Sequence, residues 1–149
     1  MSQSTTNQAL IASGLSEVAL GALTGWPYAL VISDPERARE LGIRSGARMR
    51  QWHLDLIALG SLSVLVGTAV PDLPRSVAVP LGIGAWTNAN AFGVLVVRPE
   101  LKEHPLYRAA VATSFVSVSW GCSALAALNV RRLRRARRPR PFRFGRGRR

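Results

Sequence analysis

RQWHLDLIALGSLSVLVGTAV, residues 50–70, is the stretch that decides the fold we expect. It is an apolar run that opens with a histidine and an aspartate, and as a helix it is long enough to cross a bilayer core of about 30 Å. His53, Gly60 and Gly67 recur at seven-residue spacing, which brings all three to one side of a helix. A possible metal ligand therefore stands at the head of a smooth face, and we expect the other apolar runs of the chain to assemble around it.

The composition is that of a membrane protein with a basic appendix. Of the 149 residues, 48% are hydrophobic, yet the net charge is +12. The two facts are compatible because eleven of the twenty basic residues lie at 131–149, away from the apolar sequence. Nearly all basic residues are arginine, which together with abundant Ala, Val and Gly indicates a bacterial source. Cys122 is the single cysteine, so an internal disulfide is excluded, and thiolate zinc sites, iron–sulfur clusters and covalently attached haem are disfavoured.

Four apolar runs predict an all-α, integral membrane four-helix bundle in one domain. Four spans place both chain ends on the same side of the membrane. The arginines that follow the last span place that side in the cytoplasm under the positive-inside rule, so we expect a multi-pass protein of the bacterial inner membrane. The predicted segments are a polar terminus at 1–7, spans at 8–33, 52–70, 77–97 and 109–130, and an Arg-rich tail at 131–149.

The Arg-rich tail has no apolar periodicity, and we expect it to lie disordered on anionic lipid. Its arginines, with Phe142 and Phe144 between them, also have the composition of a segment that contacts a nucleic-acid backbone. Because the same composition anchors a tail to a membrane, nucleic acid ranks last among the expected partners.

Polar groups inside the spans require an explanation, because a charged residue at the bilayer centre costs roughly 2.5 to 3.5 kcal/mol on translocon scales. Glu17 lies well inside the first span, on a stripe with Ser13, Gly21 and Thr24. We expect its carboxyl group to be protonated or paired. A helix–helix hydrogen bond on a small-residue face is one interpretation, and a role in catalysis or in lining a pocket is the other.

Asn88 and Asn90 fall at the middle of the third span, beside Trp86. Trp86 and Asn90 share one helix face by their i, i+4 spacing, and Asn88 shares another with Phe92. Adhesion between helices, at about 0.6 kcal/mol per hydrogen bond, would account for such residues. Two amides and an indole at bilayer depth nevertheless favour a polar pocket.

His53 and Asp55 open the second span. Taken alone, His53 is most simply an interfacial histidine beside Trp52. Asp55 does not share its face, and a carboxylate is favoured near a helix start by the helix dipole.

The HLD sequence at 53–55, followed by a small and apolar run that ends at Pro71, resembles a helix of hydroxylaminobenzene mutases and styrene oxide isomerases. Residues 81–92, LGIGAWTNANAF, are similar to the next helix of the isomerases, where Trp-Ser-Asn occurs in place of WTN at 86–88. Four spans, a short second connection and an Arg-rich C-terminus also match, so the resemblance covers roughly residues 48–132.

The resemblance implies a membrane haem protein. In the isomerases the helix histidine is an axial ligand of haem b, held between subunits of a trimer. Ferric haem acts there as a Lewis acid and opens an epoxide to an aldehyde without net redox change, whereas the mutases rearrange arylhydroxylamines to aminophenols. By resemblance, His53 is the iron ligand of a homotrimer that takes a small apolar substrate from the bilayer. The other expected site residues are Gly60, Trp86 and Phe92 beside the cofactor, and Asn88, Asn90, Asp55 and Glu17 as catalytic polar groups.

Departures from the isomerases leave alternatives open. Where the isomerases carry an asparagine, an aspartate and a tyrosine in the pocket, this chain has Leu59, Gly84 and Phe92. The HLD sequence is closer to that of the mutases. We therefore expect an isomerase of the epoxide or hydroxylamine type, with a non-catalytic haem protein (a sensor or gas binder) and a cofactor-free structural membrane protein as the alternatives.

Overall fold

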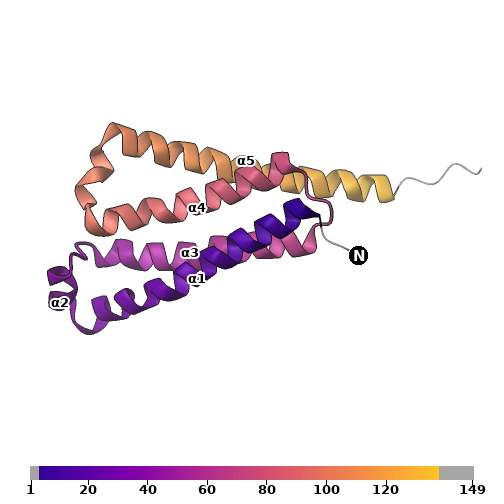
Figure 1. Ribbon diagram of the computed structural model, residues 1–149. Coiled ribbons are helices and arrows are strands. Elements are labelled where there is room, and N and C mark those ends of the chain that lie inside the picture. Colours follow the sequence, from indigo (N-terminus) through magenta and orange to yellow (C-terminus); the bar gives the residue numbers. More distant parts are fainter. Residues whose placement is uncertain (1–3, 138–149) are drawn as a thin grey trace, which may run out of the picture.

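A computed structural model describes residues 4–137, and every element in that range is helical. Four long helices run side by side and alternate in direction, so that the two ends of the described chain lie at the same end of the molecule (Figure 1). The elements are α1 (Thr5–Ser33), α2 (Pro35–Glu40), α3 (Gly46–Ala69), α4 (Arg75–Val97), the 3-10 helix η1 (Pro99–Glu103) and α5 (Pro105–Ala136).

The long helices form two layers. α1 packs on α3 and α4 packs on α5, while α3 and α4 join the two pairs (Figure 1). α1 also touches α4, but among the long helices α5 makes its extensive contacts with α4 alone. The all-α prediction is confirmed, whereas the four helices do not close into a ring within one chain.

Glycines allow α1 and α3 to approach each other closely. A Cβ atom on Gly14 would lie 2.5 Å from the carbonyl oxygen of Gly60, and a Cβ atom on Gly60 would lie 2.7 Å from that of Gly14. We call this interface between α1 and α3 the seam. Further along it, a Cβ atom on Gly67 would lie 2.6 Å from Cγ1 of Ile11. No side chain fits at these positions without moving a helix, so the smooth face of α3 is the face that packs on α1.

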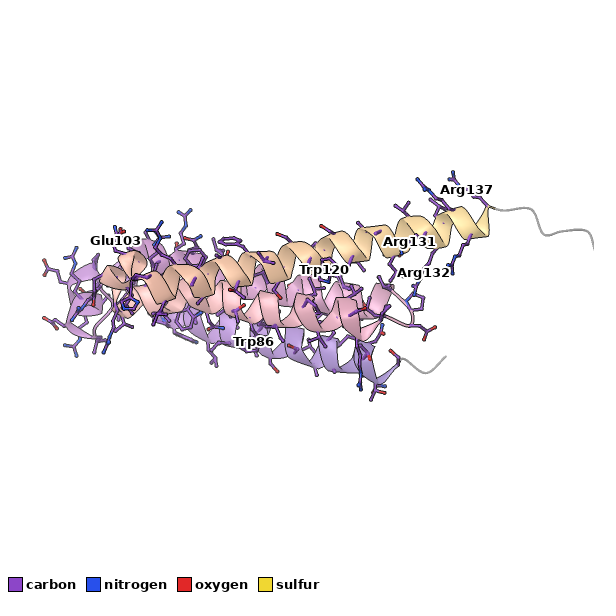
Figure 2. The ribbon with its side chains drawn as sticks, turned by 90° about the horizontal axis from the view of Figure 1, so that it is seen from above. Trp86, Glu103, Trp120, Arg131, Arg132 and Arg137 are labelled. Carbon is purple, nitrogen blue, oxygen red and sulfur yellow. The ribbon has the colours of Figure 1, made fainter. Side chains whose placement is uncertain are left out.

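A proline in α4 explains one contact with α5. Pro80 has no N–H group, so the carbonyl of Ser76, four residues earlier, loses its helical partner. The indole Nε1 of Trp120, labelled in Figure 2, donates to that carbonyl at 3.4 Å. Ser117 donates to the carbonyl of Pro80 itself at 2.8 Å.

The N-terminal residues are ordered further than the sequence predicted. α1 begins at Thr5, with Ser4 as its N-cap, so the predicted polar terminus at 1–7 already contains helix. Asn7 is 2% exposed. Its amide Nδ2 donates to the carbonyls of Gly67 and Val70 at 2.7 Å each, and its Oδ1 accepts from the N–H of Leu73 at 3.0 Å. One side chain thus completes the hydrogen bonds at the end of α3 and in the turn that follows.

Two other helices extend past the predicted spans. α3 starts at Gly46, capped by Ser45, and not at 52. α5 continues through the arginines to Ala136, so the first residues of the predicted disordered tail are helical because arginine is a good helix former. The remainder of that prediction, residues 138–149, lies outside the described residues.

Three helices, α1, α3 and α5, are long and apolar enough to cross a membrane. α4 matches the predicted span at 77–97 in position and has 23 residues. Its central polar residues lower its mean hydropathy, and it is not among the three. The sequence and the structure therefore agree on the apolar character of the chain and on three of its four predicted spans.

Replacing Gly60 with alanine tests the close approach of α1 and α3. The added methyl group would meet the backbone of Gly14, so we expect a loss of about 1–3 kcal/mol in the free energy of unfolding. Gly82→Ala is the matched control, because the nearest atom to its Cβ is the flexible tip of Leu10 at 3.4 Å. Denaturant titration in detergent, followed by circular dichroism, measures the free energy of unfolding of both variants. Equal stability of the two would contradict the close approach of α1 and α3 at Gly60.

Asn7→Ala tests the contribution of the buried amide. It leaves the N–H of Leu73 without its acceptor and two carbonyls without a donor, so we expect a loss of about 1–3 kcal/mol in the same titration. Asn129→Ala removes an exposed amide that bonds only to Leu125 of its own helix, and should change stability little. An Asn7 variant as stable as the Asn129 variant would show that this terminus is frayed.

Candidate functional site

His53 lies on the α3 face that packs on α1, and its ring is held by the backbone of α1. Nδ1 lies 2.8 Å from the carbonyl oxygen of Gly21 and 3.2 Å from the hydroxyl of Thr24, which itself donates to the same carbonyl. A carbonyl oxygen only accepts, so Nδ1 carries the hydrogen and Nε2 keeps its lone pair. Within residues 4–137, Nε2 has no hydrogen-bond partner.

Two residues of α1 shape the space around this ring. A Cβ atom on Gly25 would lie 3.4 Å from Cε1 of His53, so the absence of a side chain there leaves room beside the imidazole. The ring of Tyr28 lies tilted against it, with the centroids 5.6 Å apart. His53 is half-buried. In histidines that bind metals, one ring nitrogen likewise donates a hydrogen bond to a fixed acceptor, and the other nitrogen binds the metal.

The resemblance places Gly60 beside the cofactor, but within one chain α1 fills the face of α3 that carries Gly60 and Gly67. Gly60 lies against Gly14 and Glu17, and Gly67 against Ile11. The glycines serve the packing of two helices, and the space next to His53 is instead made by Gly25.

Glu17 is on the same seam as His53 but not beside it. Its Cβ lies opposite Gly60, at 2.8 Å from the position of a Cβ there. Gly60 is seven residues from His53, which corresponds to about 10 Å along α3. Glu17 is 0% exposed, and neither carboxyl oxygen has a hydrogen-bond partner among the described residues.

Asn90 and Trp86 connect helices. The indole of Trp52 donates to Oδ1 of Asn90 at 3.2 Å, joining α3 to α4, and Nδ2 of Asn90 donates to the carbonyl of Trp86 at 2.8 Å. The indole of Trp86 donates to the hydroxyl of Ser13 at 2.9 Å and joins α4 to α1. These are the adhesive hydrogen bonds that the sequence offered as the simpler interpretation.

Asn88, Phe92 and Asp55 lie apart from that network. Asn88 is half-buried and makes no hydrogen bond within the part of the chain that is described. Phe92 lies beneath the guanidinium group of Arg48, which is 5.6 Å from the ring centroid. Asp55 does not cap a helix start, since α3 begins nine residues earlier at Gly46.

Three hollows indent the surface of the described helices. One of about 590 Å³ is lined by Asp55 with Tyr28 and Arg50. A second, of about 610 Å³, lies between α1 and α4 and includes Trp86. A third, of about 530 Å³, lies between α4 and α5. His53 does not line any of the three.

The described residues supply a suitable ligand atom for a haem, but they do not form a cavity beside it that could hold the macrocycle. One histidine suffices because the macrocycle supplies the other four ligands, and Nε2 of His53 is free for that role. Among residues 4–137, no three His, Cys, Asp or Glu side chains gather as ligands of a bare metal ion. Room for a macrocycle would have to come from outside the single chain.

The sequence alone does not identify two residues that contact the candidate site. Thr24 belongs to the predicted stripe of α1, and its hydroxyl contacts His53. Ser13 belongs to the same stripe and receives the hydrogen bond of Trp86. The i, i+4 spacing identified the right face of the helix, but their partners lie 29 and 73 residues away in the sequence.

The fold and composition define an all-α protein with three helices able to cross a membrane. No family model matches the chain, and comparisons with curated proteins and with solved structures found no match either.

The two asparagines of α4 give a matched test of adhesion. Asn90→Leu breaks the hydrogen bond to Trp52, so we expect a loss of about 0.6 to 1 kcal/mol in unfolding free energy. Asn88→Leu removes no hydrogen bond and should leave stability unchanged or raised. Detergent-based unfolding followed by tryptophan fluorescence measures both, and a larger loss for Asn88→Leu would refute this assignment.

Proposed function

We propose that this chain is an integral membrane protein of four antiparallel spans, in which α4 is the fourth. The length of α4 supports this, because 23 helical residues extend about 35 Å. α4 also packs between α3 and α5, which are both apolar enough to cross a membrane. Its polar centre is turned in part toward the other helices through Trp86 and Asn90, where lipid does not reach.

The orientation we propose places both termini in the cytoplasm of a bacterial cell. Charge supports it: the end of α5 carries Arg131, Arg132 and Arg137 on a part of the helix that extends beyond the others (Figure 2). The opposite end, where Glu103 lies, mixes acids with bases. Arginines next to a span favour the cytoplasmic side and contact anionic lipid there.

We further propose that His53 is the axial ligand of a haem b. The observation that carries this proposal is the bond between Nδ1 and the carbonyl of Gly21, because it orients the ring and, in the neutral imidazole, leaves the Nε2 lone pair unused. When bound, ferric haem supplies a Lewis acid. The residues of the chain orient the histidine through Gly21 and Thr24 and leave space beside it at Gly25.

A homo-oligomer, a trimer by resemblance, is part of this proposal. A single chain offers a ligand without a cavity around it, so a second copy would have to enclose the cofactor. α5 supports such an assembly, since it packs on α4 alone among the long helices and exposes Phe115, Val116 and Trp120.

The activity we propose is a redox-neutral isomerisation of a small apolar substrate that enters from the bilayer, such as an epoxide or an arylhydroxylamine. A non-catalytic haem protein is the second candidate, and one observation favours it. Asn90 and Trp86 are already used in bonds between helices, and Glu17 lies about 10 Å from the histidine along the seam.

An absorption spectrum of the detergent-purified protein tests the haem site. We expect a Soret band that shifts on reduction and is lost in His53→Ala. His104→Ala is the matched control, because His104 caps α5 through the N–H of Leu106 at the molecule's exposed end, and it should retain the band. An equal Soret band in His53→Ala, or no band after addition of hemin to the wild type, would refute haem binding through His53.

Turnover assays on the haem-loaded protein separate the two candidates. Conversion of an epoxide to an aldehyde, or of an arylhydroxylamine to an aminophenol, supports the isomerase. Haem binding without turnover of either class supports a sensor or gas binder. A colourless, folded protein supports a structural membrane protein whose histidine serves helix packing.

A further inference from the structure

Glu17 is the buried polar group that the packing of this protein does not explain. It is 0% exposed in the seam between α1 and α3, and both carboxyl oxygens lack partners among residues 4–137. One turn further along the same seam, the hydroxyl of Ser63 is 1% exposed and also lacks a partner. Ser63 faces Gly14, and Glu17 faces Gly60, so both groups lie at the closest approach of the two helices.

Apart from Ser63, the other buried polar side chains among the described residues are paired, and that contrast separates Glu17 from adhesive residues. Asn7 makes three bonds to the end of α3 and the turn beyond it. Thr24 bonds to Gly21, and Ser114 bonds to Gly84 and Thr87. Glu17 makes no such bond, so an apolar side chain of the same size would pack equally well at its position.

No cation faces Glu17 from the elements packed around it. On α3 the nearest titratable group of the same face is His53, about 10 Å along the helix, and its Nδ1 is bonded to Gly21. Asp55 lines the hollow with Tyr28 and Arg50, at the far end of the seam. α4 has no titratable residue between its ends, Arg75 and Arg98, and the charges of α2 follow the C-terminal end of α1.

The electrostatic consequence is that an ionised carboxylate has no compensation in this seam. Burying an unpaired charge in an apolar interior is strongly unfavourable, and a neutral acid avoids most of that cost. The closed packing of Gly14 against Gly60 is therefore compatible with the neutral acid alone.

We propose that Glu17 is a proton-binding site inside the membrane domain, closed by the α1–α3 seam. The ligand is the proton itself, bound to a carboxyl oxygen. The seam must open at the Gly14–Gly60 crossing for that proton to leave. This inference is independent of haem binding and of any isomerase activity.

Infrared spectroscopy of the full-length protein in lipid bilayers tests the proposal. We expect a carboxylic-acid C=O band at neutral pH that is lost in Glu17→Gln, a variant of equal size and no charge. The band should shift when H₂O is replaced by D₂O, because the proton exchanges when the seam opens. Glu103→Gln, which alters an exposed acid at the end of the molecule, is the matched control and should keep the band (Figure 2).

Three results would overturn the proposal. A band that survives in Glu17→Gln belongs to another acid. A band that does not shift in D₂O excludes exchange through the seam. A band that disappears when sodium replaces choline at constant pH and ionic strength identifies the ligand as a metal cation rather than a proton.

Labelling of the wild-type protein with a hydrophobic carbodiimide gives a second readout that needs no variant. This reagent adds to protonated carboxyl groups in apolar surroundings. We expect the adduct at Glu17, with its rate falling as the pH is raised. An adduct found only at the exposed acids of the loops would overturn the assignment.

Discussion

The close approach of α1 and α3 is the constraint on which the rest of the structure depends. At the Gly14–Gly60 crossing each glycine faces the other's carbonyl oxygen, and any Cβ would meet the opposite backbone. In a membrane, burial of apolar side chains does not drive helices together, because lipid is equally apolar, so this close packing has to supply the association. The same proximity brings Asn7 within reach of the end of α3 and brings the carbonyl of Gly21 to the ring of His53.

The second layer is attached by a different kind of interaction. Side-chain hydrogen bonds join α4 to three other helices. Asn90 accepts from Trp52 of α3, and Trp86 donates to Ser13 of α1. Thr87 donates to the hydroxyl of Ser114 in α5. Each bond is modest in free energy, about 0.6 kcal/mol on average. Several of them help to fix the rotation of α4, together with the close approach of Gly84 to Val118 of α5 and of Gly93 to Trp52 of α3. The polar centre that lowers its mean hydropathy is thus what connects the layers.

Much of the fold is readable in the sequence, because long apolar runs leave little choice besides helix. The boundaries were harder to predict, since Ser4 and Ser45 cap helices earlier than the apolar runs begin. The seven-residue spacing of His53, Gly60 and Gly67 did identify a real face of α3. The spacing does not say what lies against that face, because a face without bulky side chains can pack against a ligand or against another helix.

The same holds for the candidate site: the sequence identifies its residues but not their neighbours. His53 and Glu17 were recognisable as unusual residues for an apolar helix, and both lie on the seam. That they are about 10 Å apart could not be derived, because it depends on the register of α1 against α3. The carboxyl group of Glu17 has no hydrogen-bond partner among the described residues, although leaving a buried polar group unpaired costs about 1–3 kcal/mol. Packing alone would replace Glu17 with an apolar residue, so its presence on the tightest interface of the described helices argues that the seam serves a function beyond holding two helices together.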